Sequence, residues 1–183
     1  MTIVSPINSR FFLGISILIL GIIMVFGKRA DTLKSTLAGE PVKVEGFSEA
    51  KRQENKEPTR IIIPEISIDL IVKRAEIVTG YWQVFIDSAA WGAGSGYPGE
   101  PGNQVIFAHA REGLFLPLKS IKKDAKIYVL TKDEWHAYKV VEIKEVYPNQ
   151  VEVVEPTKDE TLTLYTCSGF EDSKRLIVIA KRT

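Results

Sequence analysis

Cysteine is almost absent from this chain, which has a single thiol, Cys167, in 183 residues. One cysteine excludes an intramolecular disulfide and a zinc site built from several thiolates. The sequence also lacks a compact run of acidic residues of the kind that would indicate a calcium site. We therefore expect no metal site and no bound cofactor.

An excess of charge of one sign is lacking as well. Lysine and arginine total 24, aspartate and glutamate total 23, and the formal net charge is +1. The sequence shows no basic stripe interleaved with aromatic residues, so we expect no nucleic-acid partner. Hydrophobic residues make up 45% of the chain, which is enough for one folded domain with its own core.

Charged residues are missing from one stretch near the amino terminus. Residues 11–27 contain none, and as a helix they would extend about 25 Å, slightly less than the ~30 Å hydrocarbon core of a bilayer. Arg10 and Lys28 could reach the interfaces by snorkelling. The competing interpretation is a cleaved signal peptide, but Lys28 and Arg29 form a poor cleavage context. We predict a short tail over residues 1–10 and a transmembrane anchor over residues 11–27.

Residues 28–58 are polar, with mixed charges and little periodicity. We expect a linker between membrane and domain; the alternative is a short helix packed on the domain. The basic residues that flank the apolar run are Arg10 before it and Lys28, Arg29 and Lys34 after it. By the positive-inside rule, this count would place the carboxyl-terminal part inside the cell.

Residues 59–183 read as a mainly β domain. Short runs rich in β-branched and aromatic residues alternate with Gly, Pro and Asn turn signals, which is typical of a sandwich or a closed barrel. The expected strands are Arg60–Ile63, Ile66–Val72, Tyr81–Ile86, Gln104–His109, Lys126–Thr131, Trp135–Tyr147, Val151–Val154, Thr161–Cys167 and Arg175–Lys181. A helical turn is expected within Leu114–Ile121 and a hairpin loop at Lys132–Glu134.

Cys167 ends one of these strands. Because side chains alternate along a strand, the thiol lies on the face opposite Leu162 and Leu164. A Ser-Gly pair follows at once, so the thiol would be presented where a rigid strand gives way to a turn. The alternative is that this cysteine is a small buried hydrophobe with no chemistry.

Histidine and arginine supply the possible partners of this thiol. His109 ends an apolar strand and is followed by a loop, from which it can be aimed into a groove, whereas His136 lies inside an aromatic-flanked strand and is more typical of a satisfied residue. Arg175 opens the last strand, eight residues after Cys167. One loop can therefore return Arg175 to the cysteine strand; the alternative is a solvated arginine at a strand end.

Together these three residue types suit acyl transfer. A thiol becomes a good nucleophile when a cation or imidazolium lies nearby. A histidine can supply that charge and then protonate a leaving amine. An arginine can hold a substrate carbonyl or a developing oxyanion without losing its charge. The set predicts cleavage of an amide through a thioester.

Three motifs in this chain resemble those of the sortases, the surface-protein transpeptidases. Thr163–Cys167, with the sequence Thr-Leu-Tyr-Thr-Cys, resembles the Thr-Leu-x-Thr-Cys signature. Pro98–His109 is similar to the Pro-Gly-x-x-Gly-Asn run that leads to the sortase histidine, and Lys174–Val178 is similar to the segment with the sortase arginine. The resemblance covers residues 60–183, and an apolar amino-terminal anchor is also usual in the family.

The resemblance implies a closed β-barrel of about eight strands. It implies that Cys167 attacks the Thr–Gly bond of a Leu-Pro-x-Thr-Gly sorting signal, with His109 as general acid and base and Arg175 as the stabiliser of substrate or oxyanion. The partners implied are surface proteins or pilins that bear the signal, and an amine from a peptidoglycan precursor or a pilin lysine. The domain would lie on the extracellular side of the cell membrane, against the charge count above.

Two other functions are consistent with parts of the sequence. A cysteine transpeptidase of the L,D type would also use cysteine and histidine, but its histidine-glycine and serine-x-glycine-cysteine arrangements are missing here. A membrane-anchored β-barrel that only binds a partner would use Cys167 for packing. The residues that follow His109 and Cys167 are not diagnostic of one sortase subclass, so the subclass stays open.

Overall fold

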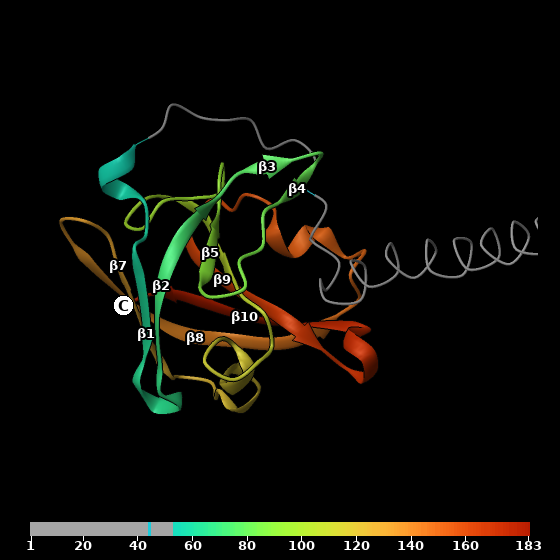
Figure 1. Ribbon diagram of the computed structural model, residues 1–183. Helices are drawn as coiled ribbons and strands as arrows, with labels where there is room; N and C mark the ends of the chain where they lie inside the picture. The colour runs from blue at the N-terminus through green and yellow to red at the C-terminus, as the bar shows by residue number, and fades with distance from the viewer. Residues whose placement is uncertain (1–43, 45–52) are drawn as a thin grey trace, which may run out of the picture. The chain divides into compact units, whose positions relative to one another are not determined.

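The computed structural model describes residue 44 and residues 53–183 (Figure 1). The expected anchor, residues 11–27, lies outside the described residues, as does most of the expected linker. In the described part of the chain, no helix is both long enough and apolar enough to cross a membrane.

Eight strands form a closed barrel, as expected from the sequence. In spatial order their neighbours are β1-β2-β5-β6-β9-β10-β8-β7, and β1 also pairs with β7. The strands are β1 (Arg60–Ile63), β2 (Ile68–Ala75), β5 (Ala89–Gly92), β6 (Gly102–Phe107), β7 (Lys126–Leu130), β8 (Trp135–Val146), β9 (Glu160–Ser168) and β10 (Lys174–Arg182). The pairs β2–β5 and β6–β9 are parallel and the others antiparallel.

Shorter elements connect these strands. A two-stranded hairpin is formed by β3 (Ile77–Val78) and β4 (Tyr81–Trp82). The 3-10 helices are η1 (Glu54–Lys56), η2 (Pro64–Ile66), η3 (Leu116–Ser120), η4 (Val151–Val154) and η5 (Phe170–Asp172). The helical turn expected in Leu114–Ile121 is therefore present as η3, and the expected hairpin loop joins β7 to β8.

The alternation of side chains along the strands creates two apolar layers. One set of alternate residues fills the interior of the barrel, including Ile106, Leu164 and Val178. The other set covers the outer face of β6, β9 and β10, where the Phe107 ring stacks on Tyr165 with 4.8 Å between centroids. Both faces of these three central strands are therefore buried, which makes them a rigid support for residues at their ends.

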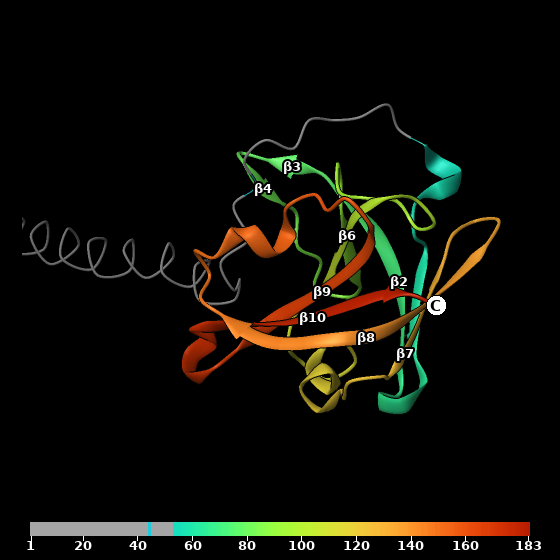
Figure 2. The ribbon, with the colours of Figure 1, turned by 180° about the vertical axis from the view of Figure 1, so that it is seen from behind.

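Figures 1 and 2 show how the central strands run across the molecule. The turn that joins β9 to β10 lies at one side, and β10 ends at the opposite side, where the carboxyl terminus is marked. β9 runs the opposite way, from Glu160 to Ser168. Residues at the end of β9 and at the end of β10 thus belong to opposite ends of the barrel.

One expected strand, Val151–Val154, is wrong, because this segment forms the 3-10 helix η4. Three valines gave it a high β propensity, but Val154 is only 2% exposed and packs on the outer apolar layer. The side-chain amide of Asn103 donates to the backbone oxygens of Val153 (3.2 Å) and Glu155 (3.0 Å). These bonds replace the strand ladder that the segment would otherwise need.

Other boundaries differ as well. Of the expected strand Tyr81–Ile86 only β4 is formed, and β5 was not expected from its Ala-Ala-Trp-Gly sequence. Gly92 in β5 is required for packing, since a β-carbon there would lie 2.5 Å from Cε2 of Trp82. Close approach of an aromatic ring to a strand backbone is one of the uses of glycine in sheets.

The segment just before the barrel contacts it. Glu57 is buried and accepts a hydrogen bond from Nη1 of Arg74 at 2.7 Å. Lys56 forms an ion pair with Glu100. These residues fall inside the range expected to be a linker, so at least its last residues pack on the domain.

Candidate active site

Cys167 and Arg175 face each other across two strands. Cys167 lies near the end of β9, and the antiparallel register of β9 and β10 pairs it directly with Arg175. The thiol is half-buried, while Arg175 is only 4% exposed. Arg175 is therefore not a solvated arginine at a strand end, which was the alternative interpretation of its position.

His109 reaches the same place from β6. This strand runs parallel to β9, with Phe107 opposite Tyr165, so His109 lies two residues beyond one member of that pair and Cys167 two residues beyond the other. A buried hydrogen bond from Oγ1 of Thr166 to the backbone oxygen of Ala108 continues the pairing past the end of β6, at 2.8 Å. The structure thus brings all three sequence-predicted residues to one edge of the sheet.

Alternation assigns two of these residues to the same face. Tyr165, Phe107 and Ile177 belong to the outer apolar layer. Cys167 and Arg175 each stand two positions from one of these residues, and side chains two positions apart in a strand share a face. His109 lies two residues beyond the end of β6, so alternation does not fix its face. The thiol and the guanidinium therefore lie on the outside of the barrel, at the end of its most deeply buried strands.

The backbone at His109 is fixed by the loop that follows it. The backbone oxygen of His109 accepts hydrogen bonds from the N–H groups of Arg111 and Phe115, both at 3.0 Å. Phe115 and Leu114 are buried in the barrel interior. Anchoring of the loop in the core holds the histidine without using its imidazole.

Arg175 is held by main-chain oxygens. Its Nη1 donates to the backbone oxygen of Asp172 at 2.8 Å and to that of Lys174 at 3.0 Å. A buried guanidinium with fixed partners is preorganised, so it can meet a developing negative charge without reorganising.

Burial and nearby charges set the protonation of the thiol. Burial raises the pKa of Cys167 above its ordinary value, and the carboxylate of Asp172 acts in the same direction. Arg175 opposes both, with a smaller contribution from Lys119. The net direction favours a protonated thiol in the free protein.

The histidine shifts in the opposite direction. Burial lowers the pKa of His109, and the charge of Arg111 lowers it further, while Asp172 raises it. Both His109 and Cys167 are therefore mainly neutral at neutral pH. The thiolate–imidazolium form is the minor one, and a substrate that fills the site can favour it only through contacts that prefer that form.

A narrow apolar pocket adjoins Arg175. It lies between the end of β8, the 3-10 helix η4 and β10, and its walls include Val146, Val154 and Ile177. Tyr165 also lines it. Its volume is only about 10 Å³, so it is a small gap in the packing beside the buried guanidinium.

His136 is not brought to this site. It lies near the start of β8, beside the start of β9 and the end of β10, at the opposite end of the barrel. It is 4% exposed, and its Nδ1 contacts Nη1 of Arg182. Since arginine can only donate, Nδ1 is the acceptor and the ring is neutral with its proton on Nε2.

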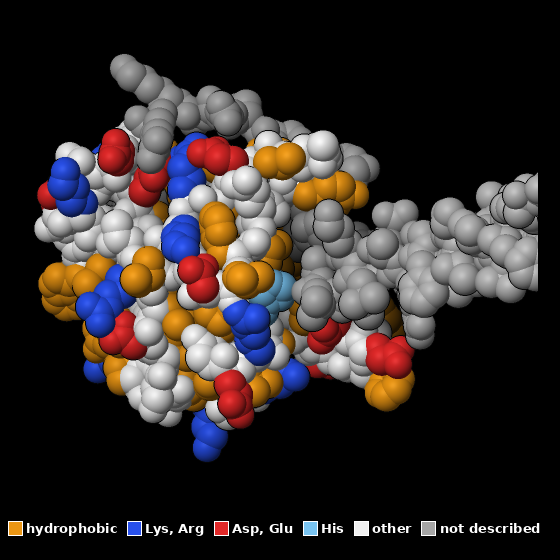
Figure 3. Space-filling model, viewed as in Figure 1, with side chains coloured by type: hydrophobic (Ala, Val, Ile, Leu, Met, Phe, Trp, Pro, Cys, Tyr) orange, Lys and Arg blue, Asp and Glu red, His pale blue; other side chains and the backbone are white. Residues whose placement is uncertain are grey.

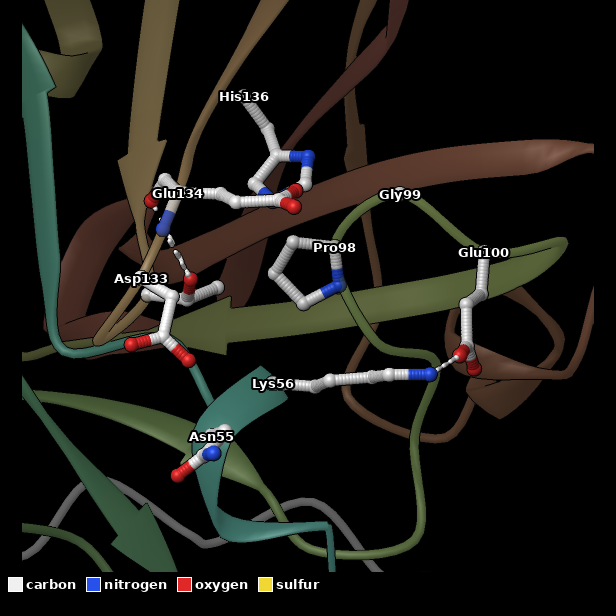
Figure 4. Close-up of a pocket in the computed structure, with 9 residues that line it drawn as sticks. Asn55, Lys56, Pro98, Gly99, Glu100, Asp133, Glu134 and His136 are labelled. Carbon is white, nitrogen blue, oxygen red and sulfur yellow. Dashed lines mark hydrogen bonds and ion pairs between the residues drawn. The ribbon is translucent and has the colours of Figure 1, made fainter.

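A pocket of about 360 Å³ opens above this second histidine. Figure 4 shows the ring of His136 near the carboxylate of Glu134, with 3.7 Å between Nε2 and Oε2. Gly99 lies against the ring, and a β-carbon there would come within 2.8 Å of Cε1 of His136. Among the described residues, no group of three or more His, Cys, Asp or Glu side chains is placed to hold a metal ion.

Two residues of the site were not found from the sequence. Asp172 influences both Cys167 and His109, and Thr166 ties the two strands that carry them. Asp172 has a left-handed backbone with φ of 57°. Aspartate tolerates this conformation better than most residues, but a lone Asp in a turn gives no sequence signal of a catalytic neighbourhood.

Comparison with known proteins relates the chain to one family. A sequence profile described as "Sortase domain" matches residues 61–183. Sortase A of Bacillus anthracis is 31% identical over 124 residues, which cover 66% of this chain and 57% of that protein. Sortase A of Streptococcus agalactiae is 41% identical over 69 residues, 37% of this chain and 28% of that protein. The aligned parts thus span less than two thirds of these relatives.

Solved structures give the same relation. The pilus-related sortase C of Group B Streptococcus superimposes with a TM-score of 0.62 at 25% identity, over 84% of this chain and 85% of that one. Sortase C of Streptococcus pneumoniae gives 0.59 at 30% identity, over 77% and 74%. A lid mutant of sortase A from Corynebacterium diphtheriae gives 0.60 at 27%, over 73% and 72%.

Proposed function

The chain belongs to the sortase family, and we propose that it is a cysteine transpeptidase with Cys167 as nucleophile, His109 as general acid and base, and Arg175 as oxyanion stabiliser. One observation carries this assignment. A buried guanidinium is paired in register with the single thiol of the chain, and the histidine lies two residues beyond the end of the adjacent parallel strand β6. A binding module would have no use for a buried cation beside a thiol.

The first half of the reaction forms a thioester. The Cys167 sulfur attacks the carbonyl carbon of the scissile amide after its proton has passed to His109. The carbonyl oxygen becomes an oxyanion and accepts hydrogen bonds from Arg175. The carbon–nitrogen bond then breaks, and the leaving amine takes the proton from the His109 imidazolium. The acyl group remains on sulfur.

The second half transfers this acyl group. An incoming amine loses a proton to His109 and attacks the thioester carbon, again with Arg175 beside the oxyanion. The carbon–sulfur bond breaks and the thiolate leaves, which recovers the proton from His109. Atoms and charges balance, and no cofactor takes part.

The substrate follows from the resemblance. We infer a Leu-Pro-x-Thr-Gly-type signal that is cut between Thr and Gly. The donors are surface proteins or pilins, and the acceptor is the amine of a peptidoglycan precursor or a pilin lysine. Pilus-related and pneumococcal sortase C structures are among the structural relatives, and the latter is described as bearing on pilin substrate specificity.

The same proposal includes a location. We infer that residues 11–27 anchor the chain in the cell membrane with the catalytic domain on the extracellular side. The apolar run and the family membership support this arrangement. The basic residues after the run argue for the opposite orientation, so protease accessibility of the domain in intact cells is the test of this point.

Mass spectrometry of the purified protein with a panel of Leu-Pro-x-Thr-Gly peptides tests the activity. We expect a covalent adduct on Cys167 whose mass equals the peptide up to threonine less one water. Hydroxylamine should release it, because a thioester reacts with this amine. The Cys167→Ala variant should keep its thermal unfolding midpoint and form no adduct.

The rival functions predict other results. A folded protein whose thiol is inert to alkylating reagents and to every peptide would be a binding module. A thiol that reacts with peptidoglycan stem peptides but not with sorting peptides would indicate a transpeptidase of the L,D type. Turnover of sorting peptides by Cys167→Ala would remove the nucleophile assignment.

A further inference from the structure

Three lysines stand side by side on the outside of the barrel, away from the active site. The register of β7, β8 and β10 pairs Lys126 with Lys139 and Lys139 with Lys181. Like charges directly opposite each other on neighbouring strands destabilise a sheet. The three residues are far apart in the sequence, so this basic row exists only in the folded protein.

Aromatic residues flank this row. Two positions along β7, Tyr128 is paired with Ala137 of β8, and Trp135 lies two positions before that alanine on the same face. The rings of Tyr128 and Trp135 contact at 5.8 Å between centroids, yet Trp135 remains 65% exposed. An exposed tryptophan next to lysines is unusual in packing terms, because burial of that ring would stabilise the fold.

The lysines and the aromatic residues together line a shallow hollow of about 580 Å³, with the small Ala137 at its floor. We call it the basic–aromatic hollow. Among the described residues no acidic side chain lines it, and Arg182, which also forms an ion pair with Glu160 at 3.8 Å, adds a fourth cation to its rim. Figure 3 shows hydrophobic, basic and acidic side chains close together at the edge of the molecule where β7 lies.

Acidic residues nearby do not neutralise the row. In the described part of the chain, Lys139 forms a distant ion pair with Asp124, at 3.9 Å, and that carboxylate is 72% exposed. Lys181 donates to the hydroxyl of Thr161 at 2.6 Å, which leaves its charge uncompensated. Exposed ion pairs at such distances contribute little, so the hollow is available to an external anion.

We propose that the basic–aromatic hollow binds the phosphate-bearing headgroups of anionic lipids, and so docks the catalytic domain on the membrane surface. This inference rests on the proposed function, since it requires the membrane anchor at residues 11–27. Val44 is buried on the domain and its N–H donates to the backbone oxygen of Gly80, so the chain between the anchor and this contact is residues 28–43, which can extend at most about 58 Å. The domain therefore stays within reach of its own bilayer, and any face with affinity for lipid is presented to it.

The composition of the hollow favours a bilayer over a soluble polyanion. Lysines attract anionic headgroups within a Debye length of the surface. Tryptophan and tyrosine suit the boundary between headgroups and acyl chains, because each has an apolar body and a polar tip. Val141 also lines the hollow and is 38% exposed. A dissolved polyanion would offer this side chain no apolar contact, whereas the boundary of the acyl chains would.

The full chain in vesicles tests the proposal through its own fluorescence. Trp82 and Trp91 are 1% and 0% exposed, so Trp135 is the tryptophan of this chain that a lipid can contact. We expect brominated phosphatidylcholine to quench the emission in vesicles that also contain phosphatidylglycerol. The quenching should fall by at least half in vesicles without the anionic lipid and at high salt, and Trp135→Phe should abolish it.

A charge-matched pair of variants isolates the basic row. Lys126→Gln, Lys139→Gln and Lys181→Gln together should lose the quenching and unfold at an equal or higher temperature, because their mutual repulsion is relieved. The control carries Lys122→Gln, Lys123→Gln and Lys158→Gln, three exposed lysines outside the hollow, and should behave as wild type. If the triple variant unfolds, Lys139→Gln alone should show a partial loss.

Other outcomes would overturn the proposal. Equal quenching in neutral and anionic vesicles, or equal loss in both triple variants, would mean that no specific headgroup site exists. Full protection by dissolved glycerol phosphate would indicate a small-anion site instead of a membrane surface. Adduct formation with a soluble sorting peptide, measured on the same preparations, separates a failure of docking from a failure of the transpeptidase proposal.

Discussion

Thr166 donates its hydroxyl to the backbone oxygen of Ala108 at 2.8 Å, and both groups are buried. The two residues immediately precede Cys167 and His109 in the sequence. Together with the bond from the N–H of Ala108 to the backbone oxygen of Tyr165 at 3.4 Å, this hydrogen bond links the segments after β6 and at the end of β9, next to the imidazole and the thiol. It fixes the separation of the two groups through the backbone.

Replacement of Thr166 by valine should loosen this link. The change keeps the shape of the side chain but leaves the Ala108 oxygen buried and unpaired, which costs about 1–3 kcal/mol. We expect a lower free energy of unfolding by chemical denaturation and a lower kcat/KM for a sorting peptide. Thr166→Ser keeps the hydroxyl and is the control. A weakened Thr166→Ser variant beside an unchanged Thr166→Val variant would show that the methyl group, and not the hydrogen bond, matters.

Arg175→Ala should reduce kcat/KM by about 10²-fold or more, the effect expected when an oxyanion donor is removed. Arg175→Lys keeps the charge but loses Nη1, which donates to the backbone oxygens of Asp172 and Lys174. Its activity should fall between those of wild type and Arg175→Ala. Peptide cleavage and thermal unfolding should be measured together. Full activity in the lysine variant would show that charge alone suffices.

The Cys167 thiol should lose its proton only at high pH. Burial raises the pKa of Cys167 above its ordinary value of 9.0, and only the thiolate is alkylated by iodoacetamide. The rate of alkylation should therefore still be rising above pH 9. A rate that levels off near neutral pH would contradict the direction of this shift and would indicate a stable thiolate–imidazolium pair.

Asp172→Asn should lower the pKa of both groups, because its carboxylate raises that of Cys167 and that of His109. The alkylation profile should move to lower pH than that of wild type. The hydrogen bond to Arg175 uses the backbone oxygen of Asp172, so the substitution spares it. Glu171→Gln removes the same charge from the neighbouring residue and should leave the profile unchanged.

Acid should destabilise the barrel through His136. Burial lowers the pKa of this histidine in the folded protein below its ordinary value of 6.5, and Arg182 lowers it further. The unfolded chain therefore binds the proton first. The stability that neutral His136 provides is fully present above pH 6.5 and is lost as pH falls toward the folded pKa. Thermal unfolding should show this loss.

The matched variant for this effect is His136→Gln. It should flatten the part of the pH dependence that His136 causes, and it should leave peptide cleavage near neutral pH largely intact, because the residue lies at the other end of the barrel. If His136→Gln lost as much activity as His109→Ala while its fold stayed unchanged, the catalytic histidine would be His136 and not His109.

The sequence predicted the barrel strands where alternation and turn residues agreed. Arg60–Ile63 was found to the residue, and the strands around Cys167 and Arg175 within one residue. β5 was missed because alanine and glycine carry no β signal, and its glycine is explained only by the ring of Trp82. η4 was predicted wrongly as a strand because Val154 is buried against the outer apolar layer, a contact that local propensity does not contain.

The sequence indicated the candidate site only through the types of residue that its chemistry needs. Cys167, His109 and Arg175 were selected because thiol, imidazole and guanidinium suit acyl transfer, and the barrel brings them to one edge. The burial of Arg175 and the role of Thr166 depend on strand register. The basic row on β7, β8 and β10 could not be predicted for the same reason, because its three lysines become neighbours only when the strands pair.

The β9–β10 hairpin carries both the sulfur and the guanidinium, whereas the imidazole comes from a strand some sixty residues earlier. Cys167 and Arg175, two of the three site residues, therefore lie in one contiguous segment of the chain. Recombination with a relative at the outer ends of this hairpin would preserve the spacing between the thiol and the guanidinium, while the rest of the domain would come from the relative. A crossover inside the hairpin would separate the two. Chimeric libraries built on this scaffold should place their junctions accordingly.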